Sequence, residues 1–275
     1  MSQPAPAWSD RFSPEKLQGV SVHLPSGPLT GEWAWGGSAG EGIRVGIIDS
    51  GVDNDHPAVA GTVTQWASFA YDRSSGKTEE CFDEHEDSFG HGTACADVIR
   101  RLAPKAELVS IKILGKRLGC RGNEFLRALR WALDQNLDLI NLSLGTRKKE
   151  FYSRFHELTE EAYFRNVGLI TAANNMPIIS FPSLYSSVFS VACAPKTDEY
   201  DPFFYLYNPQ PPPEFGAPGI GLDLAWLKGG TLTVTGNSFA APHITGLLAR
   251  IRSKHPDLNH SLLKSVLQLT ARNVT

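Results

Sequence analysis

Short runs of apolar and β-branched residues recur along the chain at residues 43–48, 108–113, 137–142, 167–171 and 188–191. Each run has the length of a strand, and continuous apolar character is typical of strands that are buried on both faces. Between these runs, apolar residues recur at helical spacing over residues 94–102, 123–136 and 151–166. Two further helical patterns, at 238–255 and 260–271, close the chain, so strand and helix alternate over most of its length.

This alternation predicts an α/β fold: a three-layer, doubly wound, mostly parallel sheet with helices on both faces. In such sheets, functional groups gather beyond the carboxyl ends of the strands. Residues 1–42 are rich in Pro, Gly, Ser and Trp and show no sustained period, which predicts an irregular N-terminal arm. The remaining residues, 43–275, are then expected to form one domain.

Composition narrows the classes of function. With 41% hydrophobic and 20% charged residues among 275, the chain is neither disordered nor fibrous. Its net charge is −3, so we expect no nucleic-acid partner. No apolar run approaches about 18 residues and no signal-peptide pattern opens the sequence, so we expect no membrane partner and a cytoplasmic location.

The cysteines do not indicate a metal site. Cys81, Cys95, Cys120 and Cys193 show neither a C-x-x-C pair nor a zinc-binding spacing. We therefore expect no metal and no other cofactor. Free thiols in a reducing compartment are the simplest interpretation, and a bridge between Cys81 and Cys120 stays open as an alternative.

Three short motifs contain residues suited to catalysis. The first apolar run leads into Asp49, at the carboxyl edge of the sheet. His91 lies between Gly90 and Gly92 at a helix start, where the helix dipole favours the neutral imidazole that a general base needs. Ser238 opens a long apolar helix, with a backbone N–H that no helical partner satisfies. Alone, each is also typical of local structure: a turn, a helix cap or an N-cap serine.

Together, the three residues stand in the chain order Asp, His, Ser that subtilisin shows. From about residue 42 onward the sequence resembles the subtilisin-like serine peptidases, or subtilases. The resemblance implies a subtilisin-like fold and a triad in which Ser238 attacks a peptide carbonyl. His91 would carry the proton and Asp49 would orient the imidazole.

A fourth motif, at residues 169–176, is an apolar run that ends in two amides. In subtilases an asparagine here donates to the oxyanion, and the match falls on Asn175, which together with the Ser238 N–H would form the oxyanion hole. The chain departs from the family pattern at three positions. Asn174 replaces the usual glycine, Asn237 the usual threonine and Phe239 the usual methionine.

The resemblance also implies how a peptide or protein substrate binds. An extended substrate would lie as an added strand between two segments. One is Ser143, Leu144 and Gly145, and the other is the region after Leu114, around Gly119 to Gly122. Relatives with a strong structural calcium site usually carry an acidic residue where this chain has Ala58, so we expect no obligatory calcium.

An acidic segment precedes the histidine motif. Residues 79–87 contain six carboxylates, and the kexin-like branch of the family has acidic residues at this place. We predict that Glu86 and Asp87 face the substrate and favour basic residues. A solvated acidic loop is the alternative.

The sequence thus predicts a serine endopeptidase that works through an acyl-enzyme. Only 48 residues precede Asp49, fewer than the inhibitory prodomain of exported relatives, so we expect an intracellular processing protease of narrow specificity. Two alternatives remain at this point. One is a peptide macrocyclase or acyl transferase of the same fold, and the other is an inactive peptide-binding pseudoprotease.

Overall fold

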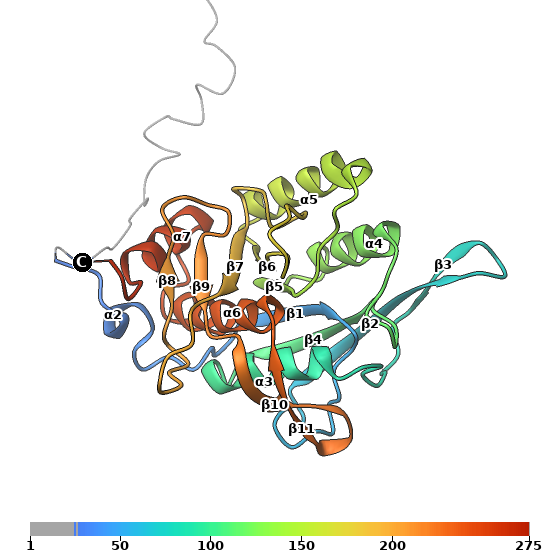
Figure 1. The fold of residues 1–275 in the computed structure, drawn as a ribbon, viewed down its shortest axis with the longest axis horizontal. Coiled ribbons are helices and arrows are strands. Elements are labelled where there is room, and N and C mark those ends of the chain that lie inside the picture. The colour runs from blue at the N-terminus through green and yellow to red at the C-terminus, as the bar shows by residue number, and fades with distance from the viewer. Residues whose placement is uncertain (1–24, 26, 275) are drawn as a thin grey trace, which may run out of the picture.

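The computed structural model describes residue 25 and residues 27–274, which are built around a nine-stranded sheet (Figure 1). Its strand order is β3-β2-β4-β1-β5-β6-β7-β9-β8. The seven inner strands of this order are parallel to one another. The two edge strands, β3 and β8, are antiparallel to their neighbours. The strands are β1 (Arg44–Asp49), β2 (Val63–Asp72), β3 (Lys77–Cys81), β4 (Glu107–Lys112), β5 (Leu139–Leu142), β6 (Gly168–Ala172), β7 (Phe189–Cys193), β8 (Leu206–Tyr207) and β9 (Phe215–Ala217).

Helices cover both faces of the sheet. The helices are α2 (Gly31–Trp35), α3 (His91–Leu102), α4 (Gly122–Leu133), α5 (Tyr152–Phe164), α6 (Asn237–Lys254) and α7 (His260–Leu269). One buried apolar cluster joins α2, α3, α6 and α7 to one face, and a second joins α4 and α5 to the other. The structure therefore confirms the predicted three-layer α/β class.

The five apolar runs form β1, β4, β5, β6 and β7, and the five helical patterns form α3 to α7, each within three residues of the prediction. The analysis of apolar runs missed the hairpin of β2 and β3. In β2 buried positions alternate with exposed and half-exposed ones, and β3 is almost wholly exposed, so neither strand reads as a continuous apolar run. A second hairpin, of β10 (Ile220–Ala225) and β11 (Thr231–Thr235), was missed as well.

The described part of the leading segment is not wholly irregular, so that prediction is wrong for α2. The Thr30 hydroxyl caps this helix by accepting the N–H of Trp33 at 3.2 Å. The Trp33 ring stacks on His255 with a centroid distance of 4.2 Å, and Trp35 lies against Tyr205. These aromatic contacts attach the segment to the domain. Residues 1–24 and 26 of the predicted arm lie outside the described residues.

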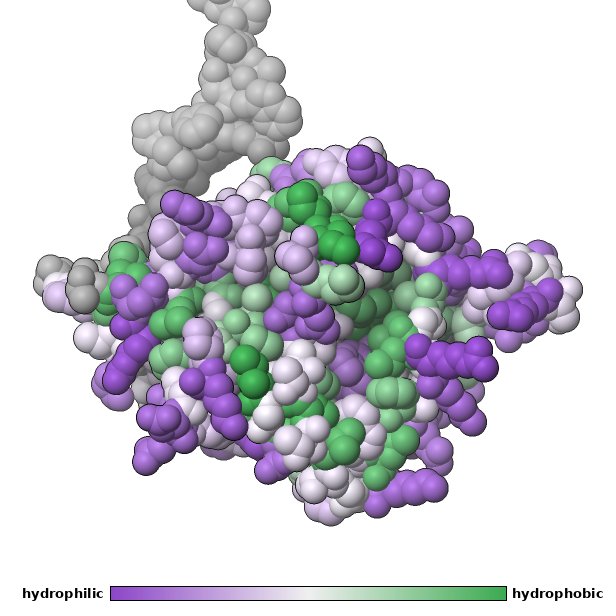
Figure 2. Space-filling view, viewed as in Figure 1, coloured by the Kyte–Doolittle hydropathy of each residue, from purple (hydrophilic) through white to green (hydrophobic). Residues whose placement is uncertain are grey.

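On the face that Figure 2 shows, hydrophilic and hydrophobic residues are intermixed. Three large apolar side chains, of Met176, Ile178 and Ile179, are exposed in the loop that follows β6. Within the described ranges, no helix combines the length and the apolar character that crossing a membrane requires.

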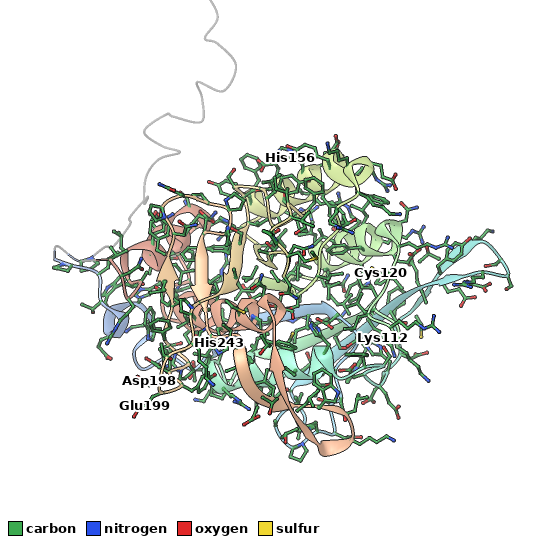
Figure 3. The ribbon with its side chains drawn as sticks, viewed as in Figure 1. Lys112, Cys120, His156, Asp198, Glu199 and His243 are labelled. Carbon is green, nitrogen blue, oxygen red and sulfur yellow. The ribbon has the colours of Figure 1, made fainter. Side chains whose placement is uncertain are left out.

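Two histidines in the apolar interior make the fold sensitive to acid. Burial lowers the pKa of His243 to about 4 from the usual 6.5; this residue, labelled in Figure 3, lies on α6. Burial, assisted by the charges of Lys264 and Arg252, lowers the pKa of His260 to about 3. Since the unfolded chain binds these protons more readily, the stability contribution is complete above pH 6.5 and is lost as the pH falls toward the folded values.

We therefore expect the free energy of unfolding to fall below pH 6.5, by about 1.4 kcal/mol per pH unit for each such histidine. Melting temperatures of the wild type and of His260→Leu, measured from pH 7 to 4.5, test this. The variant should lose less stability over that interval, whereas the same replacement at the exposed His156 should leave the pH slope unchanged. Equal slopes in wild type and His260→Leu would contradict the assignment.

Candidate active site

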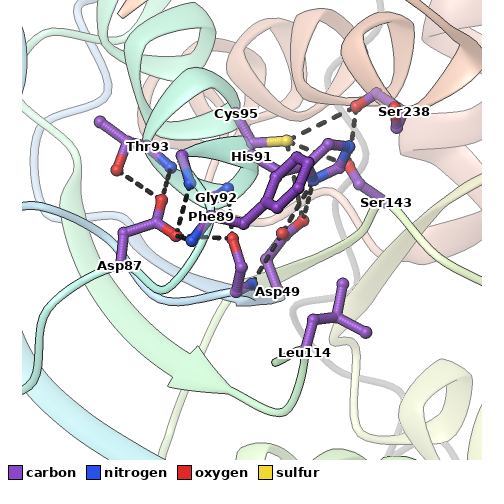
Figure 4. A network of polar contacts seen from close by, with 12 residues as sticks. Asp49, Asp87, Phe89, His91, Gly92, Thr93, Cys95, Leu114, Ser143 and Ser238 are labelled. Atoms are coloured by element: carbon purple, nitrogen blue, oxygen red, sulfur yellow. Dashed lines mark hydrogen bonds and ion pairs between the residues drawn. The ribbon is translucent and has the colours of Figure 1, made fainter. Parts of the chain in front are cut away.

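Asp49 and His91 form a buried hydrogen-bonded pair. Asp49 ends β1, a strand buried at nearly every position, and its side chain is fully buried. The Nδ1 atom of His91 lies 2.8 and 2.9 Å from the two carboxylate oxygens (Figure 4). A carboxylate only accepts hydrogen bonds, so Nδ1 carries the proton and donates. The Nε2 atom is then left as the basic nitrogen of the neutral ring.

Two features set the position and the basicity of this histidine. His91 begins α3, and a Cβ on the next residue, Gly92, would lie 2.0 Å from the Gly51 carbonyl oxygen, so only glycine allows α3 to approach the end of β1. Burial lowers the pKa of His91, but the charge and hydrogen bond of Asp49 outweigh burial and leave this pKa raised above 6.5. Asp49 thus stabilises the protonated ring that a proton transfer would create.

Ser238 lies in the first turn of α6. Its carbonyl oxygen accepts a hydrogen bond from the Ser143 hydroxyl at 2.8 Å, and this hydroxyl accepts from the Asn141 side-chain amide at 2.9 Å. Thr245, about two helical turns further along α6, donates to the same Asn141 side chain. This buried chain ties the start of α6 to the end of β5, and it leaves the Ser238 hydroxyl out of the network.

The side chain of Asn175 lies beside the Ser238 hydroxyl. Its Oδ1 atom accepts the backbone N–H of Asn237 at 2.8 Å, which directs the Nδ2 donor to the other side. A Cβ on Gly236 would lie 3.2 Å from Ser238 Oγ and 3.6 Å from Asn175 Nδ2. Because residue 236 is glycine, the space between the hydroxyl and the amide donor stays open.

His91, Asn175 and Ser238 line one cleft of about 300 Å³, and Asp49 lies behind His91, bonded to its Nδ1 atom. No hydrogen bond joins the Ser238 hydroxyl to His91 in the described part of the chain, and such catalytic bonds often close only when substrate binds. Apart from the histidine, every side chain of the cleft is uncharged. It is lined by His91, Leu114, Leu118, Ser143, Leu144, Gly145, Ala172, Ala173, Asn174, Asn175, Ser180 and Ser238.

Comparison with known proteins agrees with this geometry. The sequence model of the subtilase family matches residues 40–275. The chain belongs to the subtilase family. A thermostable alkaline protease of Halalkalibacterium halodurans is 26% identical over 246 residues, which cover 86% of this chain and 63% of that protein. Subtilisin NAT of Bacillus subtilis subsp. natto is 27% identical over 251 residues, which cover 86% of this chain and 62% of that protein.

Solved structures show the same fold. A psychrophilic protease, S41, superposes on this subtilase with a TM-score of 0.67 at 24% identity, over 90% of each chain. A cold-adapted subtilisin-like serine proteinase superposes with a TM-score of 0.66 at 21% identity, over 87% of this chain and 86% of the other. The chain spans a little over six tenths of the length of the curated relatives named above.

Some residues of the two predicted substrate-binding segments line the cleft of this subtilase, and others do not. Ser143, Leu144 and Gly145 line it, although the Ser143 side chain is buried in the Ser238 network and only its backbone can meet a substrate. In the loop after β4, Leu114 and Leu118 also line the cleft. Gly119 follows Leu118 directly and is exposed just outside the lining, so its contact with a substrate stays a prediction.

Asp87 does not face a substrate, which corrects the role predicted for it, and Glu86, the other residue of that prediction, is exposed and does not line the cleft. The Asp87 side chain is buried and accepts five hydrogen bonds. Two come from the N–H and the hydroxyl of Thr93, at 2.9 and 2.7 Å, and three come from Ser50 Oγ and the N–H groups of Phe89 and Gly90. The carboxylate therefore caps the start of α3, the helix that carries His91, and no lone pair is free for a basic residue.

We expect Asp87→Asn to lower the free energy of unfolding by about 2–4 kcal/mol. All five partners of Asp87 are donors, so the amide must turn its NH₂ group toward at least one of them whichever way it rotates. Chemical denaturation measures the loss, and Glu84→Gln, an exposed carboxylate of the same segment, serves as control. If Asp87→Asn kept its stability and changed the preferred residue beside the cleaved bond, the capping assignment would be wrong.

The cysteines are free thiols, so the alternative bridge between Cys81 and Cys120 is not formed. The Cys95 thiol is fully buried, 3.3 Å from Ser143 Oγ, and burial raises its pKa well above the usual value. Among the described residues, the only group close enough to share a metal ion is Asp49, His91 and Cys95. Proton transfer needs the same carboxylate and imidazole, so the grouping is explained without a metal.

Proposed function

We propose that this subtilase is a serine endopeptidase that hydrolyses peptide bonds through an acyl-enzyme. The observation that carries the proposal is the convergence of the Asp49–His91 pair, the Ser238 hydroxyl and the Asn175 amide on one cleft. An inactive peptide-binding protein would not need this convergence of nucleophile, base and oxyanion donor.

The geometry supports the following sequence of steps. His91 Nε2 takes the hydroxyl proton as Ser238 Oγ attacks the peptide carbonyl. The developing oxyanion accepts from the Ser238 N–H at the start of α6 and from Asn175 Nδ2. The raised pKa of His91 favours the imidazolium, which then protonates the leaving amine. Water, activated by the same nitrogen, releases the acyl group and restores the serine.

We propose a narrow specificity in which the residue next to the cleaved bond carries no charge. Apart from His91, the cleft presents only apolar side chains and uncharged polar groups, and transferring a charged side chain there without a partner is costly. Of the two acidic candidates, Asp87 has its carboxylate occupied by internal hydrogen bonds, and Glu86 is exposed and does not line the cleft. This selectivity is what a processing protease requires.

An unbiased peptide library tests the activity and its selectivity together. Mass spectrometry should show cleavage after uncharged residues, with one oxygen of H₂¹⁸O incorporated into each new carboxylate. Cyclic products that lack the added water would identify an acyl transferase instead. If the folded chain neither cleaves peptides nor reacts with a fluorophosphonate, the proposed activity is wrong.

We also propose that the enzyme acts inside the cell. Support comes from its four free thiols, the state that a reducing compartment maintains. Protein isolated from its own cells without reductant should accept four alkyl groups when it is denatured in the presence of iodoacetamide. A smaller number would point to oxidation and an extracellular place of action.

A further inference from the structure

Asn237, the residue before Ser238, connects three elements of the active site through its side chain. Its Oδ1 atom accepts the N–H of Cys193 at 2.8 Å, at the end of β7. Its Nδ2 group donates to the carbonyl oxygens of Ala173 at 3.2 Å and Asn174 at 3.0 Å, just beyond β6. The donor and acceptor partners fix which way round the amide is held. One side chain thus joins the ends of two strands to the start of α6.

The backbone of the same residue orients the oxyanion donor. The N–H of Asn237 donates to Asn175 Oδ1 at 2.8 Å, so Nδ2 of Asn175 is turned toward the Ser238 hydroxyl. The side chain of Asn237 holds the peptide segment that carries Asn175, and its backbone sets the rotation of that amide. Both groups therefore act on the distance between Asn175 and Ser238.

Asn237 does not reach the reacting atoms. The cleft that contains Ser238 and Asn175 does not include it among its lining residues. It lines a separate cavity of about 380 Å³, which shares Ala173 and Asn174 with the cleft. Any effect of its side chain on catalysis must then pass through the placement of other residues: Asn174 and Asn175 on one side, and Ser238, the next residue of α6, on the other.

We propose that Asn237 is a positioning residue that fixes the distance and orientation of the Asn175 amide relative to Ser238. The inference rests on the proposed peptidase activity and adds a residue to it. A threonine, which the family usually has here, offers one hydroxyl and could satisfy only part of this set of partners. The amide also bonds the carbonyl of Asn174, the second position at which the chain departs from the family pattern.

These two departures complement each other. The Asn174 side chain accepts the N–H of Met176 at 2.9 Å, an Asx turn that shapes the segment after β6 in place of the usual glycine. The Asn237 amide then holds the carbonyl of that turn at 3.0 Å. The pair supplies, through side-chain hydrogen bonds, a fixed geometry for Asn175.

A double-mutant cycle separates positioning from simple stabilisation. In the wild-type background, Asn237→Ala should lower kcat by about 10- to 100-fold with KM within about 2-fold, because a shift of about 1 Å at the site has this cost. In the Asn175→Ala background, the same change should lower kcat by less than about 3-fold. The pH at which His91 titrates in the activity profile should be unchanged in both.

Asn273→Ala provides a matched control. The Asn273 side chain also bridges backbone groups, the N–H and the carbonyl of Tyr207, but neither residue lines the catalytic cleft. It should change only the melting temperature. If Asn237→Ala does not fold, Asn237→Thr and Asn237→Asp take its place in the cycle, and Asp keeps the acceptor while removing the donor.

Equal losses of kcat in the two backgrounds, or a loss in melting temperature alone, would overturn the positioning role. A wild-type chain that neither cleaves peptides nor labels with a fluorophosphonate would instead contradict the proposed activity, so the two failures are distinguishable.

Discussion

Ser238→Ala is expected to lower kcat for peptide cleavage by about 10⁶-fold, the loss that removal of the nucleophile causes in subtilisin. The change deletes the only atom that would bond to the substrate carbonyl. It leaves the Ser238 backbone in place, including the carbonyl that accepts from Ser143 at 2.8 Å. Since the hydroxyl takes no part in that buried network, the variant should fold and melt like the wild type.

Single-turnover cleavage and fluorophosphonate labelling measure this effect, and both should vanish together. Ser253→Ala, on the same helix with its hydroxyl bonded to the Glu41 carbonyl, should keep full activity and labelling. Cleavage by Ser238→Ala at more than about one hundredth of the wild-type rate would mean that another group is the nucleophile.

The sequence alone was sufficient for the central strands and for the chain order of the catalytic residues. The strands that carry the site, β1, β5 and β6, are buried on both faces, so their apolar runs are unambiguous. Because parallel strands end at one edge of the sheet, Asp49 and Asn175 could be expected there together. The distance between His91 and Asp49 follows from the close approach at Gly92, which the glycine in the motif already indicated.

The role of Asp87 could not be predicted in the same way. In the sequence it is one of several carboxylates in a charged segment, and charge alone favours a surface or substrate contact. Its partners include Ser50, 37 residues earlier, and Thr93, six residues later. No spacing rule connects these residues, and only the folded turn shows that every lone pair of the carboxylate is occupied.

Asn237 illustrates a second limit. The sequence marks it as a departure from the usual threonine, but its partners Cys193 and Ala173 lie 44 and 64 residues away. They become neighbours only because β6 and β7 are adjacent in the sheet. A pattern along the chain can therefore identify the unusual residue without identifying what it holds.

Removal of the oxyanion donor is the second large effect that we expect. Asn175→Ala should lower kcat by about 10²–10³-fold, the loss that removal of the corresponding donor causes in subtilisin. The substrate in its ground state gains little from this amide, so KM should change by less than about 3-fold. The Ser238 N–H remains as the single donor, which is why activity falls without vanishing.

The neighbouring Asn174 offers the matched control for that measurement. Its side chain bonds the N–H of Met176 instead of pointing at the serine, so Asn174→Ala should cost less than about 10-fold in kcat. Asn175→Asp sharpens the comparison, because it keeps an acceptor for the Asn237 N–H but has no donor and repels the oxyanion. Activity in Asn175→Asp close to wild type, or equal losses at positions 174 and 175, would show that the Asn175 amide does not stabilise the transition state.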